Sequence, residues 1–194
     1  MLGGQSNRIG GGIKSLLKFN NKTIFDRIFE KISPNIDNII LNCNYDTTEL
    51  LKYKLPIIKD YKKGFLGPLA GIHTGMRWIL KNSPETEWLL TVPGDTPFIP
   101  KDLISRLEKK ISPNSDIILS KSNMKTNPII GLWKISLYQD LNEHLDLGTR
   151  KILSWAELHS IDFINYNFKE YDPFFNINTK EDLKLAELIE KELF

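Results

Sequence analysis

Residues 1–14 read MLGGQSNRIGGGIK and combine five glycines with one arginine and one lysine, in a stretch without apolar periodicity. Glycine lets backbone N–H groups approach a ligand because no Cβ stands in the way, and successive N–H groups in such a turn form an anion-binding concavity. Arg8 adds a planar, forked cation and Lys14 a mobile point charge. The stretch therefore favours a loop that holds a nucleoside triphosphate; the alternative is a flexible, glycine-rich terminus.

Outward from this loop, short apolar segments alternate with segments of helical periodicity. Strands are predicted at residues 38–43, 55–58, 88–92, 116–120, 128–133 and 161–165. Helices are predicted at residues 24–32, 47–54, 67–82 and 100–111, in part of 142–155 with a break at Gly148, and after the capping-box pair Thr179 and Asp182. Strands that alternate with helices indicate a sheet covered on both faces. We therefore expect one domain over residues 1–194, a three-layer α/β fold with a mostly parallel, Rossmann-like sheet.

Composition argues against several functional classes. The chain has 26 basic and 24 acidic residues and a net charge of +2, whereas a dedicated nucleic-acid-binding protein carries a strong basic excess. Cys43 is the single cysteine, so we expect no internal disulfide and no cysteine-ligated zinc, and we expect the thiol in the core. The three histidines lack metal-ligand spacing, no run approaches the ~18 apolar residues of a membrane span, and no signal peptide is recognisable. The expectation is a cytoplasmic protein that binds neither nucleic acid nor membrane.

Polar side chains that could carry chemistry follow three predicted strands: Asn42, Asp60 and Asp95. In open α/β sheets, ligands bind beyond the carboxyl ends of the strands, where the strand order switches. Asp95, fixed between Pro93 and Pro97, could hold Mg²⁺ against phosphate oxygens, or it could be a turn residue before the next helix. Asn42 and Asp60 supply an amide and a carboxylate, the pair needed to read the carbonyl and the N1–H and amino donors of guanine. Each of these two residues alone is more typical of a strand-end turn.

The glycine loop and four later segments resemble the molybdenum cofactor guanylyltransferase family of nucleotidyltransferases, in the same order along nearly the whole chain. The loop reads G-G-x-x-x-R-I-G-G-x-x-K, where the family has L-A-G-G-x-x-x-R-M-G-G-x-D-K. The other similar segments are Pro-Gly-Asp-Thr-Pro at 93–97, Gly-Pro-Leu-Ala-Gly at 67–71, Asn-Ile-Asn-Thr at 176–179 and Gly-Thr-Arg-Lys at 148–151. Ile13 stands where the family has an acid before the lysine.

The resemblance implies an activity and a site. GMP would pass from GTP to the terminal phosphate of molybdopterin, with release of pyrophosphate and with Mg²⁺ as cofactor. The implied nucleotide contacts are Leu2, Gly3, Gly4, Lys14, Asn42, Asp60 and Asp95; the implied metal contacts are Asp95 and Asn178; the implied catalytic residues are Arg8, Lys14 and Asp95; and the implied acceptor contacts are Arg150, Lys151 and Asn176. The implied partners are GTP, molybdopterin, and proteins that deliver the cofactor or mature molybdoenzymes. A related nucleotidyltransferase that uses CTP or a sugar phosphate, and an inactive nucleotide-binding adaptor, are the alternatives.

A glycine loop of this kind needs a rigid strand that enters it, but only Met1 and Leu2 precede Gly3. A mean strand has about 5–6 residues. We therefore expect the first strand to be truncated in this sequence, with a short Ile/Val-rich segment encoded just upstream.

Overall fold

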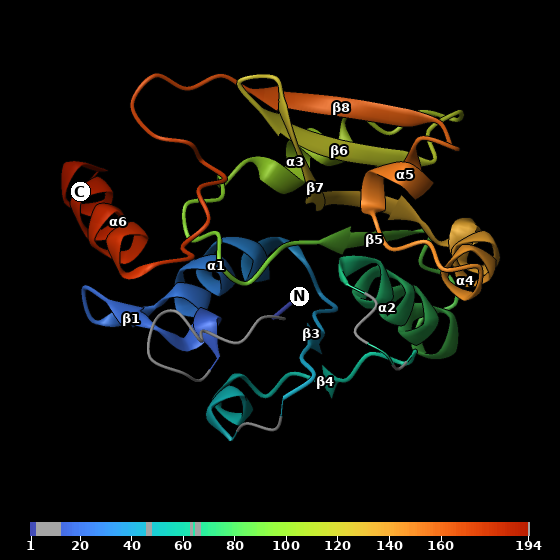
Figure 1. The fold of residues 1–194 in the computed structure, drawn as a ribbon, viewed down its shortest axis with the longest axis horizontal. Helices are drawn as coiled ribbons and strands as arrows, with labels where there is room; N and C mark the ends of the chain where they lie inside the picture. Colours follow the sequence, from blue (N-terminus) through green and yellow to red (C-terminus); the bar gives the residue numbers. More distant parts are fainter. Residues whose placement is uncertain (3–12, 46–47, 63, 65–66, 194) are drawn as a thin grey trace.

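The computed structural model describes residues 1–2, 13–45, 48–62, 64 and 67–193, and it is built around a mixed β-sheet (Figure 1). This sheet has four strands in the order β5-β7-β6-β8. These strands are β5 (Trp88–Thr91), β6 (Ile117–Ser122), β7 (Lys125–Lys134) and β8 (Ile161–Tyr166). β8 runs parallel to β6, whereas β7 runs antiparallel to both β5 and β6. The predicted α/β fold is confirmed, but the sheet is mixed rather than mostly parallel.

A tight hairpin explains the antiparallel strand. Only Asn123 and Met124 separate β6 from β7, and both have positive φ, 43° and 68°. Two consecutive left-handed residues form the hairpin turn whose twist matches that of the flanking strands. Asparagine tolerates this conformation, but methionine gives no turn signal, so the sequence pattern did not predict a direct hairpin between the two segments.

A second, parallel pair of strands lies beside the first two residues of the chain: β3 (Leu41–Asn42) and β4 (Ile57–Ile58). The Leu2 N–H donates to the carbonyl of Asn42 over 2.8 Å. On the other side, the Met1 ammonium donates to the Val92 carbonyl over 2.9 Å, and the Gly94 N–H donates to the Met1 carbonyl over 2.8 Å. Backbone hydrogen bonds of Met1 and Leu2 therefore link β3 to the segment that follows β5.

Next to Met1, between β5 and residues 36–41, lies a cavity of about 440 Å³. Its walls are mainly apolar and include Ile28, Ile39, Ile40, Trp78, Leu90 and Leu107. The predicted strand 38–43 is shorter than expected, because only Leu41 and Asn42 are paired as a strand.

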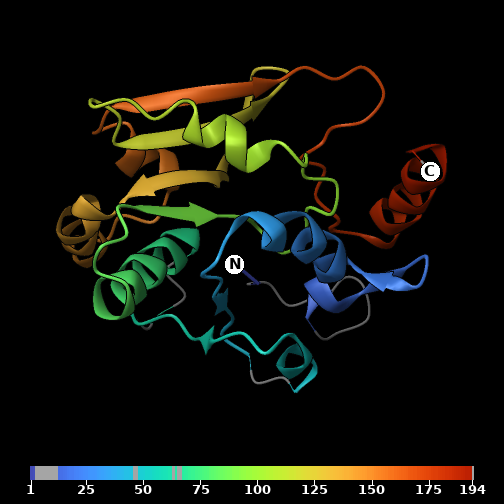
Figure 2. The ribbon, with the colours of Figure 1, turned by 180° about the vertical axis from the view of Figure 1, so that it is seen from behind.

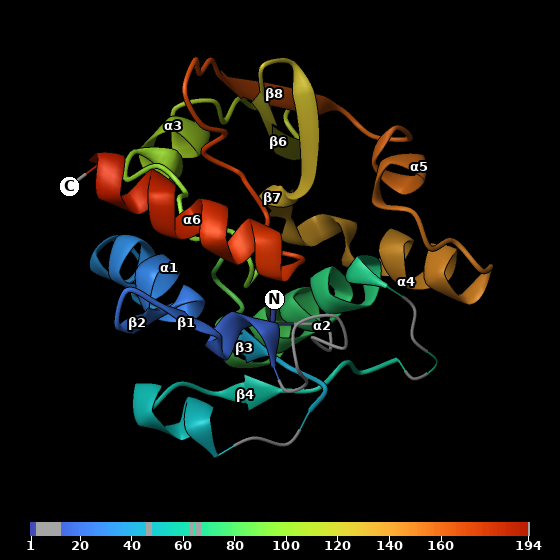
Figure 3. The same cartoon turned by 60° about the vertical axis from the view of Figure 1, so that its left-hand side comes forward.

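Buried side chains form a hydrophobic layer on each face of the sheet. Ile118 of β6 belongs to one layer and its neighbours Ile117 and Leu119 to the other, because side chains alternate across a strand. The first layer is covered by α1 (Ile24–Ile32), α3 (Leu103–Glu108) and α6 (Lys180–Leu193), and the second by α2 (Pro68–Asn82), α4 (Tyr138–Asp146) and α5 (Ile152–Ala156). Figure 3 separates the two groups of helices, and Figure 2 shows the molecule from behind. The three-layer prediction is confirmed.

Some helix boundaries follow local sequence signals, whereas the helix predicted at 100–111 is limited to α3 (Leu103–Glu108) and that at 47–54 is only a short 3-10 helix over Glu49–Tyr53. At the start of α6, Thr179 and Asp182 form the predicted reciprocal cap, with N–H···O distances of 2.8 and 3.1 Å. The segment 142–155 is divided into the end of α4 and α5 around Gly148, whose φ is 94°. The remaining short elements are η1 (Lys14–Leu16), β1 (Lys18–Phe19), β2 (Lys22–Thr23), η2 (Ser33–Asn35), η3 (Glu49–Tyr53) and η4 (Ile135–Leu137).

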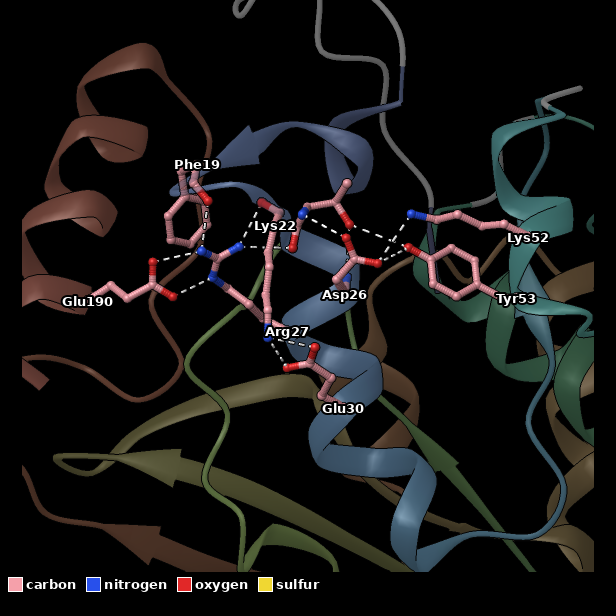
Figure 4. A network of polar contacts seen from close by, with 9 residues as sticks. Phe19, Lys22, Asp26, Arg27, Glu30, Lys52, Tyr53 and Glu190 are labelled. Atoms are coloured by element: carbon pink, nitrogen blue, oxygen red, sulfur yellow. Dashed lines mark hydrogen bonds and ion pairs between the residues drawn. The ribbon is translucent and has the colours of Figure 1, made fainter. Parts of the chain in front are cut away.

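A buried arginine joins the β1–β2 hairpin to α1 and α6 (Figure 4). Arg27 forms a bidentate ion pair with Glu190 of α6, with both N···O distances at 2.7 Å. It also donates to the backbone carbonyls of Phe19, Lys22 and Thr23 over 2.7–3.2 Å, and its guanidinium lies 3.6 Å from the centre of the Phe19 ring. The arginine therefore fixes the segment that follows Lys14 against the last helix.

The core contains the single cysteine, as predicted. Cys43 is buried, and Trp133 and Trp155 are stacked in the core with ring centres 6.0 Å apart. His73 is fully buried in α2. Within the described ranges, no helix has the length and apolar character needed to cross a membrane.

Candidate functional site

Lys14, Asp95 and Asn178 meet at one point, although they are far apart in the chain. The Lys14 ammonium lies 2.7 Å from Asp95 Oδ2 and 2.5 Å from Asn178 Oδ1. The two side chains of the ion pair are largely buried, with 11% of Lys14 and 22% of Asp95 exposed. Asp95 follows β5, as predicted for a residue at the carboxyl end of a strand, and Asn178 precedes α6. The structure thus brings together three residues that the resemblance had assigned to phosphate and metal binding.

The backbone holds Asp95 and Asn178 in place independently of Lys14. The Asp95 carbonyl accepts a 3.0 Å hydrogen bond from the N–H of Ile177. The N–H of Asn178 donates to Asp182 Oδ2 over 2.7 Å, within the cap of α6. The loop after β5 and the segment before α6 are therefore hydrogen-bonded to each other, which holds the backbone of Asp95 close to that of Asn178.

Asn176 lies in the same segment but has another partner. Its side-chain oxygen accepts a 2.7 Å hydrogen bond from the hydroxyl of Thr96, a fully buried residue. This contact ties the residue after Asp95 to the segment that carries Asn178. The predicted role of Asn176 in binding the acceptor stays a prediction.

The oxygen atoms of Asp95 and Asn178 suit a small divalent cation. They converge on a single ammonium group, so they can face one ion, and carboxylate and amide oxygens are ligands for hard cations such as Mg²⁺. Among the described residues, no group of three or more histidine, cysteine, aspartate and glutamate side chains could hold a metal ion. A magnesium ion at Asp95 would therefore take further oxygens from substrate phosphates and water, which is its usual mode of binding.

A second polar cluster surrounds Asp60, which follows β4. Its two carboxylate oxygens accept hydrogen bonds from the amides of Asn42 over 2.8 Å and Asn44 over 2.7 Å. The Asn44 side-chain oxygen also accepts from the Asp60 N–H over 2.7 Å. Asn42 and Asp60 are thus adjacent, as a shared role in base recognition requires. Asn44 was not among the predicted site residues. Its spacing of two residues from Asn42 was the available signal, because residues i and i+2 of an extended segment point to the same side.

Met1 and Leu2 lie between the two clusters. Leu2 is hydrogen-bonded to the backbone of Asn42, and Met1 to that of Gly94, the residue before Asp95. Gly71 of α2 allows a close approach on the same side, because a Cβ there would come within 2.7 Å of Asn42 Oδ1.

Three of the residues predicted in the glycine loop, Gly3, Gly4 and Arg8, lie outside the described residues. Leu2 and Lys14 stand on either side of these residues in the sequence and lie at the clusters of Asp60 and Asp95, respectively.

Arg150 and Lys151 lie at the junction of α4 and α5. Arg150 Nη1 donates to the carbonyls of Leu145 and Thr149 over 2.9 and 2.8 Å, so the guanidinium caps the end of α4. Lys151 is exposed at the start of α5. The Arg150 carbonyl lies 3.7 Å from the position of a Cβ on Gly67, which places the junction beside the start of α2. Contacts of Arg150 and Lys151 with an acceptor stay predictions.

The chain is similar in sequence to proteins of one family. The sequence model of the MobA-like NTP transferase domain matches residues 1–161. A molybdenum cofactor guanylyltransferase from Rhodopseudomonas palustris (strain BisB5) is 35% identical over 191 residues, which cover 97% of this chain and 91% of that protein. Another protein of this name, from Shewanella sp. (strain MR-4), is 31% identical over 182 residues, which cover 93% and 89%.

Solved structures show the same fold. Molybdopterin-guanine dinucleotide biosynthesis protein A from Archaeoglobus fulgidus aligns with a TM-score of 0.75 and 28% identity, over 98% of this chain and 96% of that one. A 4-diphosphocytidyl-2C-methyl-D-erythritol synthase from Anaerococcus prevotii aligns with a TM-score of 0.69 and 14% identity, over 90% and 88%. The second likeness shows the fold alone.

Proposed function

Because this chain belongs to the MobA-like NTP transferase family, we propose that it is a molybdenum cofactor guanylyltransferase, which transfers GMP from GTP to molybdopterin and releases pyrophosphate. The observation that carries the proposal is the 35% identity to a protein of that name over 97% of the chain. The two polar clusters supply a mechanism, because one suits a base and the other a triphosphate.

In this proposal, the Asp60 cluster recognises guanine. The base presents two adjacent donors, its N1–H and its amino group, and a carboxylate accepts such a pair with good geometry. Asn42 and Asn44 each occupy one side of the Asp60 carboxylate, and each oxygen keeps a further lone pair for the base. Adenine presents an acceptor at N1, which would face the carboxylate unfavourably.

The cluster of Lys14, Asp95 and Asn178 would hold the triphosphate end of GTP. Lys14 and Arg8 would bind phosphate oxygens, together with the backbone N–H groups of Gly3 and Gly4. Asp95 and Asn178 would hold Mg²⁺, which when bound would offset the negative charge of the phosphates.

The chemical step follows from this placement. A phosphate oxygen of molybdopterin attacks the α-phosphorus of GTP in line, a new P–O bond forms, and the bond between the α-phosphorus and the bridging oxygen breaks. Pyrophosphate takes the electron pair and leaves. Lys14 stabilises the charge on the phosphates, and the protein acts by positioning rather than by forming a covalent intermediate. Arg150, Lys151 and Asn176 would contact the pterin phosphate, and further proteins would supply molybdopterin or take up the product.

The test is product formation with purified protein, molybdopterin, Mg²⁺ and each of GTP, CTP and ATP. We expect the dinucleotide and pyrophosphate with GTP only. Asp95→Asn should lower turnover by about 100-fold or more; because it also removes the ion-pair partner of Lys14, its melting temperature is measured to confirm that the variant is folded under the assay conditions. Asp37→Asn, at an exposed aspartate, serves as the matched control. Pyrophosphate release without preference for guanine would favour a related nucleotidyltransferase. Binding of GTP without turnover would favour an inactive adaptor.

A further inference from the structure

The strongest feature that the proposed reaction does not explain is the position of the Lys14 ammonium. It lies between the two oxygens that would bind the metal, at 2.7 Å from Asp95 Oδ2 and 2.5 Å from Asn178 Oδ1. A magnesium ion would approach the same oxygens to about 2.0–2.1 Å. The ammonium and the ion would therefore compete for one place.

We propose that Lys14 holds the metal position in the nucleotide-free protein and leaves it when a triphosphate binds, so that the divalent cation and GTP bind cooperatively. The proposal rests on the proposed function, because it takes a nucleoside triphosphate as the ligand that draws Lys14 away. Without that ligand, a divalent cation has to displace the ammonium and gains little. With it, the ammonium has phosphate oxygens to bind.

The geometry allows this exchange without a rearrangement of the site. Lys14 lies in the short helix η1 at the end of the glycine-rich stretch, and a lysine side chain can reorient its terminal charge on a four-carbon stem. Asp95 and Asn178 are fixed by their backbone contacts with Ile177 and Asp182. The backbone that carries both oxygens is therefore held without Lys14, and only side-chain movements are needed when the ammonium leaves.

Binding of Mn²⁺ in the absence of nucleotide tests the proposal directly, with electron paramagnetic resonance of the free ion as the readout. The variant Lys14→Met removes the ammonium and keeps a stem of similar length, and Lys18→Met, at an exposed lysine of β1, is the matched control. We expect Lys14→Met to bind Mn²⁺ at least about 10-fold more tightly than the wild-type protein, and Lys18→Met to bind like the wild type. The double variant Lys14→Met/Asp95→Asn should lose the gain.

The second measurement concerns the nucleotide. Calorimetric titration should show that saturating Mn²⁺ tightens GTP binding, because coupling between two ligands is reciprocal; in Lys14→Met, GTP should bind more weakly. If folded Lys14→Met, and folded Lys14→Gln as a second variant, bind Mn²⁺ no more tightly than the wild type, the proposal is wrong. That result does not bear on guanylyl transfer. If the wild-type protein forms the dinucleotide but Lys14→Met does not bind Mn²⁺ more tightly, the proposed function stands and only the proposal that Lys14 occupies the metal position is wrong.

Discussion

The α-amino group of Met1 offers a sharp test of how this sheet is built. The ammonium is buried beside the apolar cavity and donates to the Val92 carbonyl over 2.9 Å. Burial lowers the pKa of the Met1 amino group from 8.0 to about 6, although the charge of Asp95 favours the ammonium. Burying a charge in apolar surroundings is costly, so the protonated form should weaken the fold.

The sign and size of the effect follow from proton linkage. Below pH 6, the amino group is charged in both the folded and the unfolded chain, and the folded state bears the cost of burial. Between pH 6 and 8, the unfolded chain binds more protons than the folded one, so the free energy of unfolding rises with pH. At about 1.4 kcal/mol for each pH unit between these values, the rise is about 3 kcal/mol.

The measurement compares the 194-residue polypeptide with its Nα-acetylated form by urea unfolding from pH 5 to 9. Acetylation removes the charge and keeps an N–H that can donate to the Val92 carbonyl. We expect the free energy of unfolding of the acetylated form to exceed that of the free form by about 3 kcal/mol more at pH 5 than at pH 9. Burial also lowers the pKa of His73, but His73 is present in both forms and cancels. A difference in stability that does not vary with pH would refute the argument.

Three further predictions follow from the packing. Arg27→Met should lower the free energy of unfolding by about 3–5 kcal/mol, because it leaves the carboxylate of Glu190 without its bidentate partner. The measurement is urea unfolding, with Glu190→Gln as a comparison that should be destabilised less. Equal stability of Arg27→Met and the wild type would contradict the prediction. Asn44→Ala should reduce the preference for GTP over inosine triphosphate, which lacks the amino group, by about 10-fold, because Asp60 loses one of its two amide contacts. The loss should come from a raised KM for GTP, with little change in kcat. If the ratio of kcat/KM for the two nucleotides is unchanged, Asn44 does not position Asp60. A four-residue Val/Ile extension ahead of Met1 should fill the cavity and raise the melting temperature by at least about 2–4 °C, the change that 1 kcal/mol produces in a domain of this size. A Gly/Ser extension of equal length is the control and should not raise it. Equal melting temperatures of the two extended proteins would argue against a strand in this position.

Local signals in the sequence predicted much of the fold. The alternation of apolar segments and helical periodicity gave the three layers, and the pair Thr179 and Asp182 gave the start of the last helix. These features depend on contacts within a few residues, so their physical cause is present in the local sequence. The hairpin turn at Asn123 and Met124 was missed because its second residue adopts a left-handed conformation without a glycine or asparagine to indicate it.

The site was predicted as a set of residues but not as an arrangement. Asp95, Lys14 and Asn178 were singled out from the motifs, yet nothing in their spacing shows that one ammonium lies between two oxygens. The role of Asn44 beside Asp60 was missed for the same reason, because its partner lies 16 residues away across the β3–β4 pair.

The sequence by itself therefore determined the α/β fold class, the capped start of the last helix and the chemical types of most candidate site residues, because hydrophobic periodicity, capping and chemical type are properties of short segments. Only the tertiary structure decided the direction of β7, the cavity between β3 and β5, and the contact of Lys14 with the predicted metal ligands. These features arise between segments up to 164 residues apart, and their geometry depends on how the sheet brings the segments together.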